Sequence, residues 1–497
     1  MRRRLPLIRL AALAGVLTAC GPTAPPMPSR PAPSLPQGAA LPEGKAQELG
    51  IGGPESLTIL PHAPGEQPAP STACDTAPCQ ALLKLIEGAE HSIDFAVYGM
   101  RGQPALFDAL VAAQKRGVRV RGVVDRDAQG RNYYRDTDRL VAALGQVRDD
   151  ISSERSMAAR RTVLAEMPDR CQRPKGFAGH VQCLAFDLGN ECLLAAHASE
   201  DTVEEGGAIM HDKFFIVDGR TVWTGSANVS DSDIGGYGAN LTIVVESPKI
   251  ARLYAHEFDL MFTTNRYHQE KPRERLDQTI AVGDAQVQVW FSPQDEPITR
   301  AVRPLLQKAK SRIDVAVFFL THTGITGDLI AARRRGVDVR VILDATGARN
   351  GYTKHELLRA AGIPVKVENF GGKMHAKMAV IDGRYIIGGS MNWTWAGQGG
   401  NDENTLIIDS PVRAEALHAW YDGVWQTITE RWAEQNPDPE SRDSGHACTD
   451  GIDNDFDGAI DADDPGCSAH PPPLSPLPPW KIVPKRSGSC QDELDQL

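Results

Sequence analysis

Two segments of the chain repeat one pattern of polar residues, H-x-K-x4-D-x6-G-S-x-N. The first copy places these residue types at His211, Lys213, Asp218, Ser226 and Asn228. The second copy places them at His375, Lys377, Asp382, Ser390 and Asn392. One His-x-Lys pattern alone is weak evidence, but two copies with identical internal spacing have no explanation in packing. The repeat therefore indicates a chemical task that both segments share.

Histidine and lysine two residues apart on a strand point to the same face. If the two copies meet, two imidazoles and two ammonium groups surround one cavity. The ammonium groups, helped by the Ser and Asn side chains, can hold the oxygens of a phosphodiester and stabilise its transition state. One imidazole can attack phosphorus while the other protonates the leaving oxygen. Since the lysines supply the positive charge, we expect no cofactor and no metal in catalysis.

Each motif residue also has a plainer interpretation as a polar side chain of the core or surface. This interpretation has most weight for the Ser and Asn residues, because both types cap helices and satisfy turns. It has little weight for the paired His and Lys.

The elements that would position the motifs are repeated as well. Residues 93–98 and 313–318 have the length and β-branched content of buried strands. Each is followed by a helical pattern, a glycine and a second strand, which ends at Asp125 or Asp344. These βαβ units predict an α/β fold with two pseudo-symmetric lobes, residues 73–275 and 276–435, and the active site between them.

The two halves differ in the segment before the motif. The stretch from Asp125 to His211 is more than twice as long as the matching stretch from Asp344 to His375. We therefore predict an insert at about residues 135–205, which is either a lid or specificity loop or an inert excursion.

The two motifs and their shared elements resemble the phospholipase D superfamily over residues 78–430, and Phe291-Ser-Pro293 at the start of the second half is similar to it as well. The resemblance implies a phosphohistidine intermediate, with His211 as nucleophile and His375 as acid and base. It implies that Lys213 and Lys377 bind phosphate, and that Asp218 and Asp382 order the turn of each motif.

Members of this family often place a carboxylate at a characteristic spacing past the motif histidine, where it orients the ring. Glu403 has this spacing from His375, but Ala239 stands at the matching place after His211. His211 then lacks a partner unless Asp231, Asp233 or another residue replaces it, so the roles of the two histidines could be exchanged. The plainer interpretation of Glu403 is an acidic residue before a strand.

Residues 1–19 combine a basic start, an apolar stretch and small residues before Cys20. This segment resembles a bacterial lipoprotein signal peptide, which implies lipidation of Cys20, export and anchoring to the outer membrane. An ordinary signal peptide is the alternative. Residues 20–72 are rich in Pro, Gly and Ala, and we expect a disordered tether there.

Nine cysteines are present, and eight remain when Cys20 is set aside. In an exported chain an even number suggests disulfides, with Cys74–Cys79 and Cys448–Cys467 as local candidates. The other four, Cys171, Cys183, Cys192 and Cys490, allow three pairings that the sequence cannot rank. A zinc site is the alternative, but paired C-x-x-C motifs are lacking.

Residues 443–470 form an Asp-rich segment whose loop is bracketed by Cys448 and Cys467. Its possible calcium ligands are Asp453, Asp455, Asp457, Asp461 and Asp464, with Gly458 at the sixth position. This spacing is typical of a calcium loop, and the alternative is a solvated acidic linker. Residues 471–497 are Pro-rich and extended, and we expect no catalytic role for the tail from residue 443 onward.

Hydrolysis of phospholipid headgroups by a monomeric, membrane-anchored enzyme is the function that we favour. The net charge of −11 counts mildly against a nucleic-acid partner, because binding to phosphate polyanions is driven by basic surfaces. A nuclease of the same superfamily acting on DNA or RNA is the nearest alternative. Phosphatidyl transfer, as in cardiolipin synthases, is a second alternative, and a non-catalytic surface binding module is a third, although all four His and Lys are intact.

Overall fold

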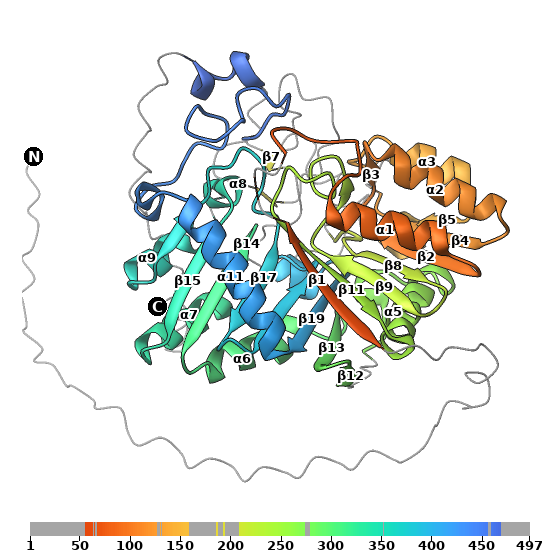
Figure 1. The fold of residues 1–497 in the computed structure, drawn as a ribbon, viewed down its shortest axis with the longest axis horizontal. Helices are drawn as coiled ribbons and strands as arrows, with labels where there is room; N and C mark the ends of the chain where they lie inside the picture. Colours follow the sequence, from red (N-terminus) through yellow and green to blue (C-terminus); the bar gives the residue numbers. More distant parts are fainter. Residues whose placement is uncertain are drawn as a thin grey trace, which may run out of the picture. The chain divides into compact units, whose positions relative to one another are not determined.

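The computed structural model describes residues 55–62, 64, 67–126, 130, 132–158, 208–273, 279–350, 352–455 and 459–468, and the backbone of residues 185–186 and 192–193. Within this part of the chain the fold is α/β, with two lobes that are each built on one mixed sheet (Figure 1). No helix among these residues is both long enough and apolar enough to span a membrane.

The first lobe contains a seven-stranded sheet in the order β1-β11-β9-β8-β2-β4-β5. Its strands are β1 (Ser56–His62), β2 (Ser92–Val97), β4 (Arg119–Val124), β5 (Val147–Asp149), β8 (Lys213–Val217), β9 (Thr221–Gly225) and β11 (Asn240–Glu246). Its helices are α1 (Ala77–Gly88), α2 (Pro104–Lys115), α3 (Thr137–Leu144) and α5 (Pro248–Phe262). Two short strands, β3 (Met100–Arg101) and β10 (Val229–Ser230), pair beside this sheet, and β6 (Ala185–Phe186) pairs with β7 (Cys192–Leu193).

The second lobe contains an eight-stranded sheet in the order β12-β13-β19-β18-β17-β14-β15-β16. Its strands are β12 (Ile280–Val282), β13 (Ala285–Ser292), β14 (Arg312–Val317), β15 (Asp338–Leu343), β16 (Val365–Val367), β17 (Lys377–Ile381), β18 (Tyr385–Gly389) and β19 (Glu403–Asp409). Its helices are α6 (Arg303–Lys308), α7 (Thr323–Arg334), α8 (Ala345–Arg349), α9 (His355–Ala360), α10 (Trp395–Gly399) and α11 (Pro411–Thr427). From β13 to β16 the strand order repeats that of the first sheet from β1 to β5.

The predicted βαβ units are present in both lobes, since β2 pairs in parallel with β4 and β14 pairs in parallel with β15. Local sequence explains where their helices end. Gly117 after α2 and Gly336 after α7 have φ values of 94° and 88°, a left-handed conformation that glycine adopts without steric cost.

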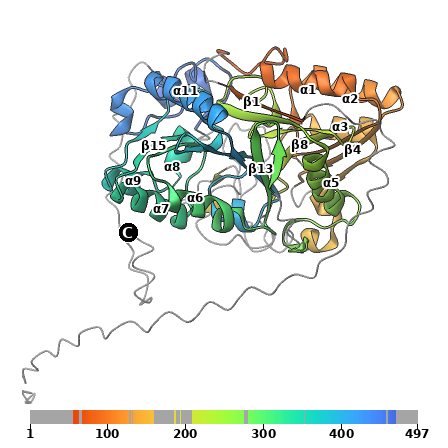
Figure 2. The ribbon, with the colours of Figure 1, turned by 60° about the horizontal axis from the view of Figure 1, so that its bottom comes forward.

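Buried apolar side chains form three main clusters that follow the layers of the fold. One cluster lies between the two lobes and joins α5 and α11 with residues of both sheets. The second packs α6 and α7 on the second sheet, and the third packs α1 and α2 on the first sheet. Figure 2 shows these two helix pairs as separate layers on their own lobes. The shared central cluster places the motif strands β8 and β17 near the boundary of the lobes.

The fold begins earlier than expected. Strand β1 lies within the segment that composition assigned to the tether, and it pairs antiparallel with β11 over its whole length. Leu57 and His62 are buried in this strand. Pro61 is tolerated because β1 is at the edge of the sheet, where a missing N–H leaves no ladder bond unmade.

The insert also begins later than expected. Helix α3 and strand β5 fall within residues 135–205, but they occupy the places of α9 and β16 in the second lobe and are part of the first lobe's own framework. The extra length therefore follows η2 (Asp150–Ser152), and most of it lies outside the described residues.

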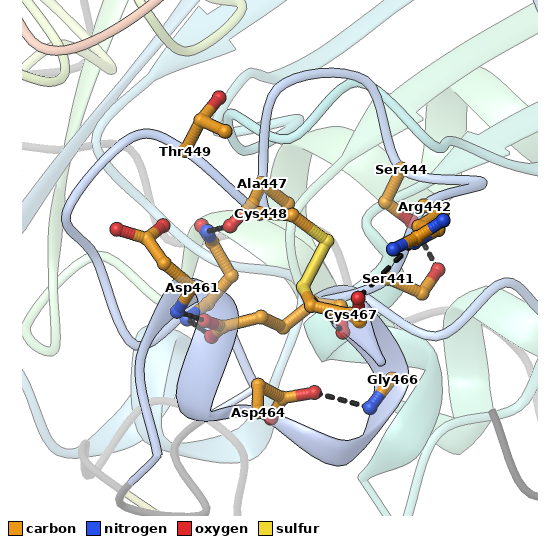
Figure 3. The surroundings of a disulfide bond; sticks show 12 residues. Ser441, Arg442, Ser444, Ala447, Cys448, Thr449, Asp461, Asp464, Gly466 and Cys467 are labelled. Atoms are coloured by element: carbon orange, nitrogen blue, oxygen red, sulfur yellow. Dashed lines mark hydrogen bonds between the residues drawn. A yellow bond between two sulfur atoms is a disulfide. The ribbon is translucent and has the colours of Figure 1, made fainter. Parts of the chain in front are cut away.

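The structure contains the disulfides Cys74–Cys79 and Cys448–Cys467, the second of which is drawn in Figure 3. The signal peptide, Cys20, Cys171, Cys183, Cys490, Asp457 and residues 471–497 lie outside the described residues, and of Cys192 only the backbone is described.

Candidate active site

The two motif histidines lie two residues before the first residues of strands β8 and β17, and each is held by the backbone of the opposite lobe. The His211 N–H donates to the Asp402 carbonyl at 2.9 Å, and the His375 N–H donates to the Ala239 carbonyl at 2.9 Å. These bonds bring the two predicted motifs together, and both imidazoles line one cavity of about 140 Å³. The site therefore requires both lobes.

The ring of His211 is bonded to a carboxylate. Its Nδ1 lies 2.8 Å from Glu403 Oε2, and both side chains are almost fully buried. Ser390 Oγ donates to the same carboxylate oxygen at 2.7 Å, and Asn401 Nδ2 donates to Oε1 at 3.2 Å. Burial raises the pKa of Glu403 to about 8, although the Lys213 ammonium and these two donors oppose the shift.

The ring of His375 has a weaker set of partners. Its Nδ1 lies 3.3 Å from Asn240 Oδ1 and 3.3 Å from Asp233 Oδ2. Burial, together with the ammonium groups of Lys377 and Lys213, lowers the pKa of His375 well below its usual value. This shift favours the neutral form of the His375 ring.

The expected relation between Glu403 and the histidines is wrong in one respect. Glu403 does not orient His375, whose spacing it matches, but His211 in the other lobe. Its counterpart in the first lobe is Asn240 and not Ala239, because Thr242 pairs with Gly225 as Thr405 pairs with Gly389. The segment from His211 to Asn240 is one residue longer than the segment from His375 to Glu403, so equal spacing pointed to Ala239 instead. Each histidine contacts the first residue of a strand in the opposite lobe, Glu403 of β19 for His211 and Asn240 of β11 for His375.

The serines of the two G-S-x-N tails hold these partners in place rather than facing the cavity. Ser226 Oγ donates to Asn240 Oδ1 at 2.9 Å, as Ser390 Oγ does to Glu403. The preceding Gly225 makes this approach possible, since a Cβ there would lie 2.1 Å from the Leu241 carbonyl oxygen. The serines are therefore placed to position the groups behind the histidines.

The asparagines of the tails differ from each other. Asn228 lines the cavity, and its Nδ2 donates to Asp233 Oδ2 at 2.6 Å, which fixes the carboxylate beside His375. Asn392 is buried but is not among the residues that line the cavity.

The two lysines are fully buried beside the histidines. Lys213 Nζ donates to the His211 carbonyl at 2.7 Å, and Lys377 Nζ donates to the His375 carbonyl at 2.6 Å. Burial lowers the pKa of Lys213 to about 8, and burial with the nearby Lys213 charge lowers the pKa of Lys377 well below its usual value. The two ammonium groups were expected to surround the cavity, but neither lysine is among the residues that line it. The charge of Lys213 acts on Lys377, and a bound anion would relieve this repulsion.

Asp218 and Asp382 lie at the far ends of β8 and β17, about 16 Å from the lysines along a five-residue strand. Asp218 accepts N–H bonds from Glu90, His91 and Ser92, and Asp382 accepts them from residues 310–312. These carboxylates order the entry to β2 and β14, so their contacts are structural and not with the cavity.

Sequence reasoning did not single out several residues of the cavity. Tyr98 packs edge-on against His211, and Phe318 packs edge-on against His375, with ring centroids 5.6 Å and 5.1 Å apart. These aromatic residues directly follow the first strand of each βαβ unit, so the repeat itself contained a signal for them. The cavity is also lined by Arg101, Tyr133, Tyr134, Tyr237, Phe319, Thr346, Lys373, Ile452 and Asn454.

Among the predicted calcium ligands that the structure describes, only Asp453 and Asp455 come together. Ligand atoms of Asp453 and Asp455 lie within 4.8 Å of each other and of Glu440, a residue outside the sequence pattern. Asp461 accepts N–H bonds from Asp450 and Gly451, and Asp464 accepts one from Gly466, as Figure 3 shows for Asp464. Asp461 and Asp464 therefore accept backbone hydrogen bonds, and Glu440 lies beside Asp453 and Asp455.

Comparisons with known proteins agree with this geometry. The family model described as "Cardiolipin synthase, PLD-like domain" matches residues 82–262 and 302–425. A mitochondrial cardiolipin hydrolase of Xenopus tropicalis is 35% identical over 127 residues, which is 24% of this chain and 58% of that protein. A phospholipase D of Rickettsia conorii is 32% identical over 137 residues, 27% of this chain and 68% of that protein. The chain spans roughly half to two thirds of the length of the curated relatives it matches.

Solved structures give similar matches. The phospholipase D family member Nuc of Salmonella typhimurium is 28% identical, with a TM-score of 0.27, and the match covers 29% of this chain and 97% of that one. The phosphatidylserine synthase of Haemophilus influenzae is 14% identical, with a TM-score of 0.49, and the match covers 76% of this chain and 91% of that one. Because the family model matches more than half of its residues, with both motifs meeting at one cavity, the chain belongs to the phospholipase D superfamily.

Proposed function

We propose that this protein is a phosphodiesterase that hydrolyses phospholipids through a phosphohistidine intermediate. The single observation that carries the proposal is the arrangement of His211 and His375 at one cavity, with a buried lysine beside each. Its relatives are a phospholipase D and a mitochondrial cardiolipin hydrolase, which supports a lipid substrate.

In the first step, His211 Nε2 attacks phosphorus and the bond to the leaving alcohol breaks. The Nδ1–H of His211 donates a hydrogen bond to the Glu403 carboxylate, which leaves the lone pair of Nε2 free and stabilises the positive ring that forms. His375 gives its proton to the leaving oxygen. The phosphate anion between the lysines opposes their charge, which allows His375 to carry that proton despite its lowered pKa.

In the second step, His375 takes a proton from water, and the hydroxide attacks phosphorus as the P–N bond to His211 breaks. Lys213 and Lys377 stabilise the charge of both transition states. The lysines supply this charge without a cation, so we propose that turnover needs no metal and no other cofactor.

A nuclease activity is the second candidate, and the aromatic lining of the cavity favours it. Tyr98, Tyr133 and Tyr134 pack against each other, with ring centroids 5.1–6.4 Å apart, and such surfaces can stack nucleic-acid bases. The acidic net charge of −11 favours the lipid.

The test uses the chain from Gly21 onward, incubated in EDTA with vesicles of phosphatidylcholine or cardiolipin and with single- and double-stranded DNA. We expect release of the head group, formation of a phosphatidyl alcohol when ethanol is added, and loss of both in His211→Ala. His91→Ala is the matched control, because this histidine is exposed and lies at the far end of the sheet. Cleavage of DNA alone would exclude the lipid reaction, and turnover of no substrate would favour a binding module.

We also propose that the mature protein is an exported lipoprotein anchored through Cys20 to the outer membrane, which rests on the signal-like segment 1–19. Labelling with palmitate tests the anchor, since a Cys20→Ala protein should carry no label. We propose a structural calcium ion near Asp453, Asp455 and Glu440, because carboxylate oxygens this close suit a cation of that kind.

A further inference from the structure

The segment that follows α11 folds back onto the second lobe as a small module, residues 438–455 and 459–467, which we call the C-terminal module. The Cys448–Cys467 disulfide closes it (Figure 3). Asn369 Nδ2 donates to the Asp443 carbonyl at 2.6 Å, and Arg349 of α8 contacts the carboxylates of Asp438 and Asp455. Figure 1 shows this blue segment above α8.

Two residues of the C-terminal module reach the catalytic cavity. Ile452 and Asn454 line it together with His211 and His375. The Asn454 carbonyl accepts hydrogen bonds from Lys373 Nζ at 2.6 Å and from Thr346 Oγ1 at 3.0 Å. Asn454 is only 1% exposed, so this is a packed contact and not a loose approach.

The C-terminal module also contacts the first lobe next to Ile452 and Asn454. The Tyr237 hydroxyl donates to the Asp450 carboxylate, and Asn454 Nδ2 donates to the same carboxylate at 2.9 Å. Tyr237 itself lines the cavity. Contacts to both lobes hold Ile452 and Asn454 at the cavity wall.

The chemistry of the proposed reaction decides which part of the substrate meets this wall. In an in-line displacement, the attacking and leaving atoms lie on opposite sides of phosphorus. His211 attacks, so the leaving alcohol lies on the side of His375, which protonates it. Lys373, which binds Asn454, is two residues before His375, and the module therefore borders the leaving-group side.

We propose that Ile452 and Asn454 form the wall that limits the size of the leaving alcohol, so that the enzyme selects lipids with compact head groups. This inference rests on the proposed function, because it assigns the leaving-group side from the roles of the two histidines. A side chain at a fixed wall discriminates by volume, and a change of a methylene or more alters relative turnover by tenfold or more.

The test compares kcat/KM for phosphatidylethanolamine, phosphatidylcholine and phosphatidylinositol, using the chain from Gly21 onward. Ile452→Ala should raise the ratio of the inositol lipid to the ethanolamine lipid about tenfold, and Ile452→Trp should lower it about tenfold. Ile460→Ala should leave the ratio unchanged, because Ile460 belongs to the same module but is 37% exposed.

Turnover of the ethanolamine lipid shows that each Ile452 variant is folded. If one of the two variants does not fold, the ratio in the other still tests the proposed wall. If the unmodified chain and the active Ile452 variants had the same ratio of kcat/KM for the two lipids, the proposal that this wall limits head-group size would be wrong. The proposed function would stand. Release of no head group by the unmodified chain would instead overturn the proposed function.

Discussion

His211 and His375 occupy equivalent positions, but the partners of their rings lie at different distances. Glu403 gives His211 a buried carboxylate at 2.8 Å, whereas His375 Nδ1 lies 3.3 Å from both the Asn240 amide oxygen and the Asp233 carboxylate. A carboxylate at 2.8 Å stabilises an imidazolium better than one that is farther away. This asymmetry supports His211 as the nucleophile, because its ring becomes positively charged when it is bonded to phosphorus.

Replacing Glu403 tests this difference. Glu403→Gln should lower the rate of head-group release in a single turnover by roughly 10²- to 10⁴-fold, because His211 loses the carboxylate that orients and stabilises its ring. Asn240→Ala is the matched variant behind His375, and we expect about a tenfold loss. A larger loss in Asn240→Ala than in Glu403→Gln would exchange the roles of the two histidines.

The pH dependence of kcat/KM should be a narrow bell with its maximum near pH 8. The carboxyl of Glu403, whose pKa is about 8, must be ionised for His211 to attack, so activity rises as pH increases through that value. Lys213, whose pKa is also about 8, must be charged to bind phosphate, so activity falls as pH increases further. In Glu403→Gln the rising limb should disappear, and its persistence would assign that limb to another group.

The sequence predicted that the two motifs meet, because their residue types and spacing repeat in both halves; both histidines line the cavity, and a lysine is buried beside each. It did not reveal the partners of the rings, which come from across the lobe boundary. Counting residues placed Ala239 opposite Glu403, but the hydrogen-bond register of β11 and β19 makes Asn240 the equivalent residue. A threonine stands two residues after both Asn240 and Glu403, at positions 242 and 405, and this shared residue type was the sequence signal for the register.

At the scale of elements, Asp218 and Asp382 link the end of a motif strand to the start of its neighbour. Burial alone would raise the pKa of Asp382, but the N–H groups of residues 310–312 hold it below its usual range. Asp382→Asn should lower the free energy of unfolding by about 1 kcal/mol, since the residue is only partly buried. Asn at position 382 can adopt the left-handed backbone conformation of Asp382, whose φ is 54°.

Denaturant unfolding measures the effect of Asp382→Asn, with the exposed Asp108 of α2 changed to Asn as the control. The kcat should change by less than about threefold, because Asp382 does not contact the cavity. A large loss of kcat without a loss of stability would contradict the structural role.

The C-terminal module should be stabilised by calcium. If Asp453, Asp455 and Glu440 bind the ion, calcium at 100 times its Kd adds about 2.7 kcal/mol to the free energy of unfolding of this part of the protein. Differential scanning calorimetry in calcium and in EDTA measures the shift. Asp453→Asn should abolish it, whereas Asp463→Asn, an exposed change nearby, should not. The same melting profile in both buffers would contradict calcium binding.

Elements with a strong local pattern were predictable, and elements that depend on tertiary pairing were not. Both βαβ units follow from runs of β-branched residues and from the glycines after α2 and α7. Strand β1 has only Leu57 and Ile59 as an alternating pattern, in a segment rich in proline, and it forms because β11 offers a free edge. Nothing in the Asp-rich segment indicated that Ile452 and Asn454 would reach the catalytic cavity.

At the scale of the whole molecule, a buried group of charges lies behind the active site and joins the lobes. Lys271 Nζ contacts the carboxylates of Glu257 and, at 2.7 Å, of Asp402 in the second lobe. His268 lies between Asp402 and Asp150, at 3.0 Å and 3.3 Å. Asp402 also accepts the backbone bond from His211 and precedes Glu403, so this group of charges is continuous with the catalytic framework.

Removing one charge from this group should destabilise the joined lobes. Lys271→Met leaves Glu257 and Asp402 without their cation, and we expect a loss of about 3–5 kcal/mol in the free energy of unfolding. The control is Lys249→Met, on the exposed side of α5.

Burial alone would lower the pKa of His268, but Asp402 and Asp150 raise it to about 9. The contribution of the charged His268 to the free energy of unfolding is therefore complete below about pH 6.5 and is lost as pH rises through 9. A His268→Gln protein should therefore lose less stability at pH 9.5 than at pH 6, measured by urea unfolding. Equal losses at the two pH values would mean that His268 is not charged in the folded protein.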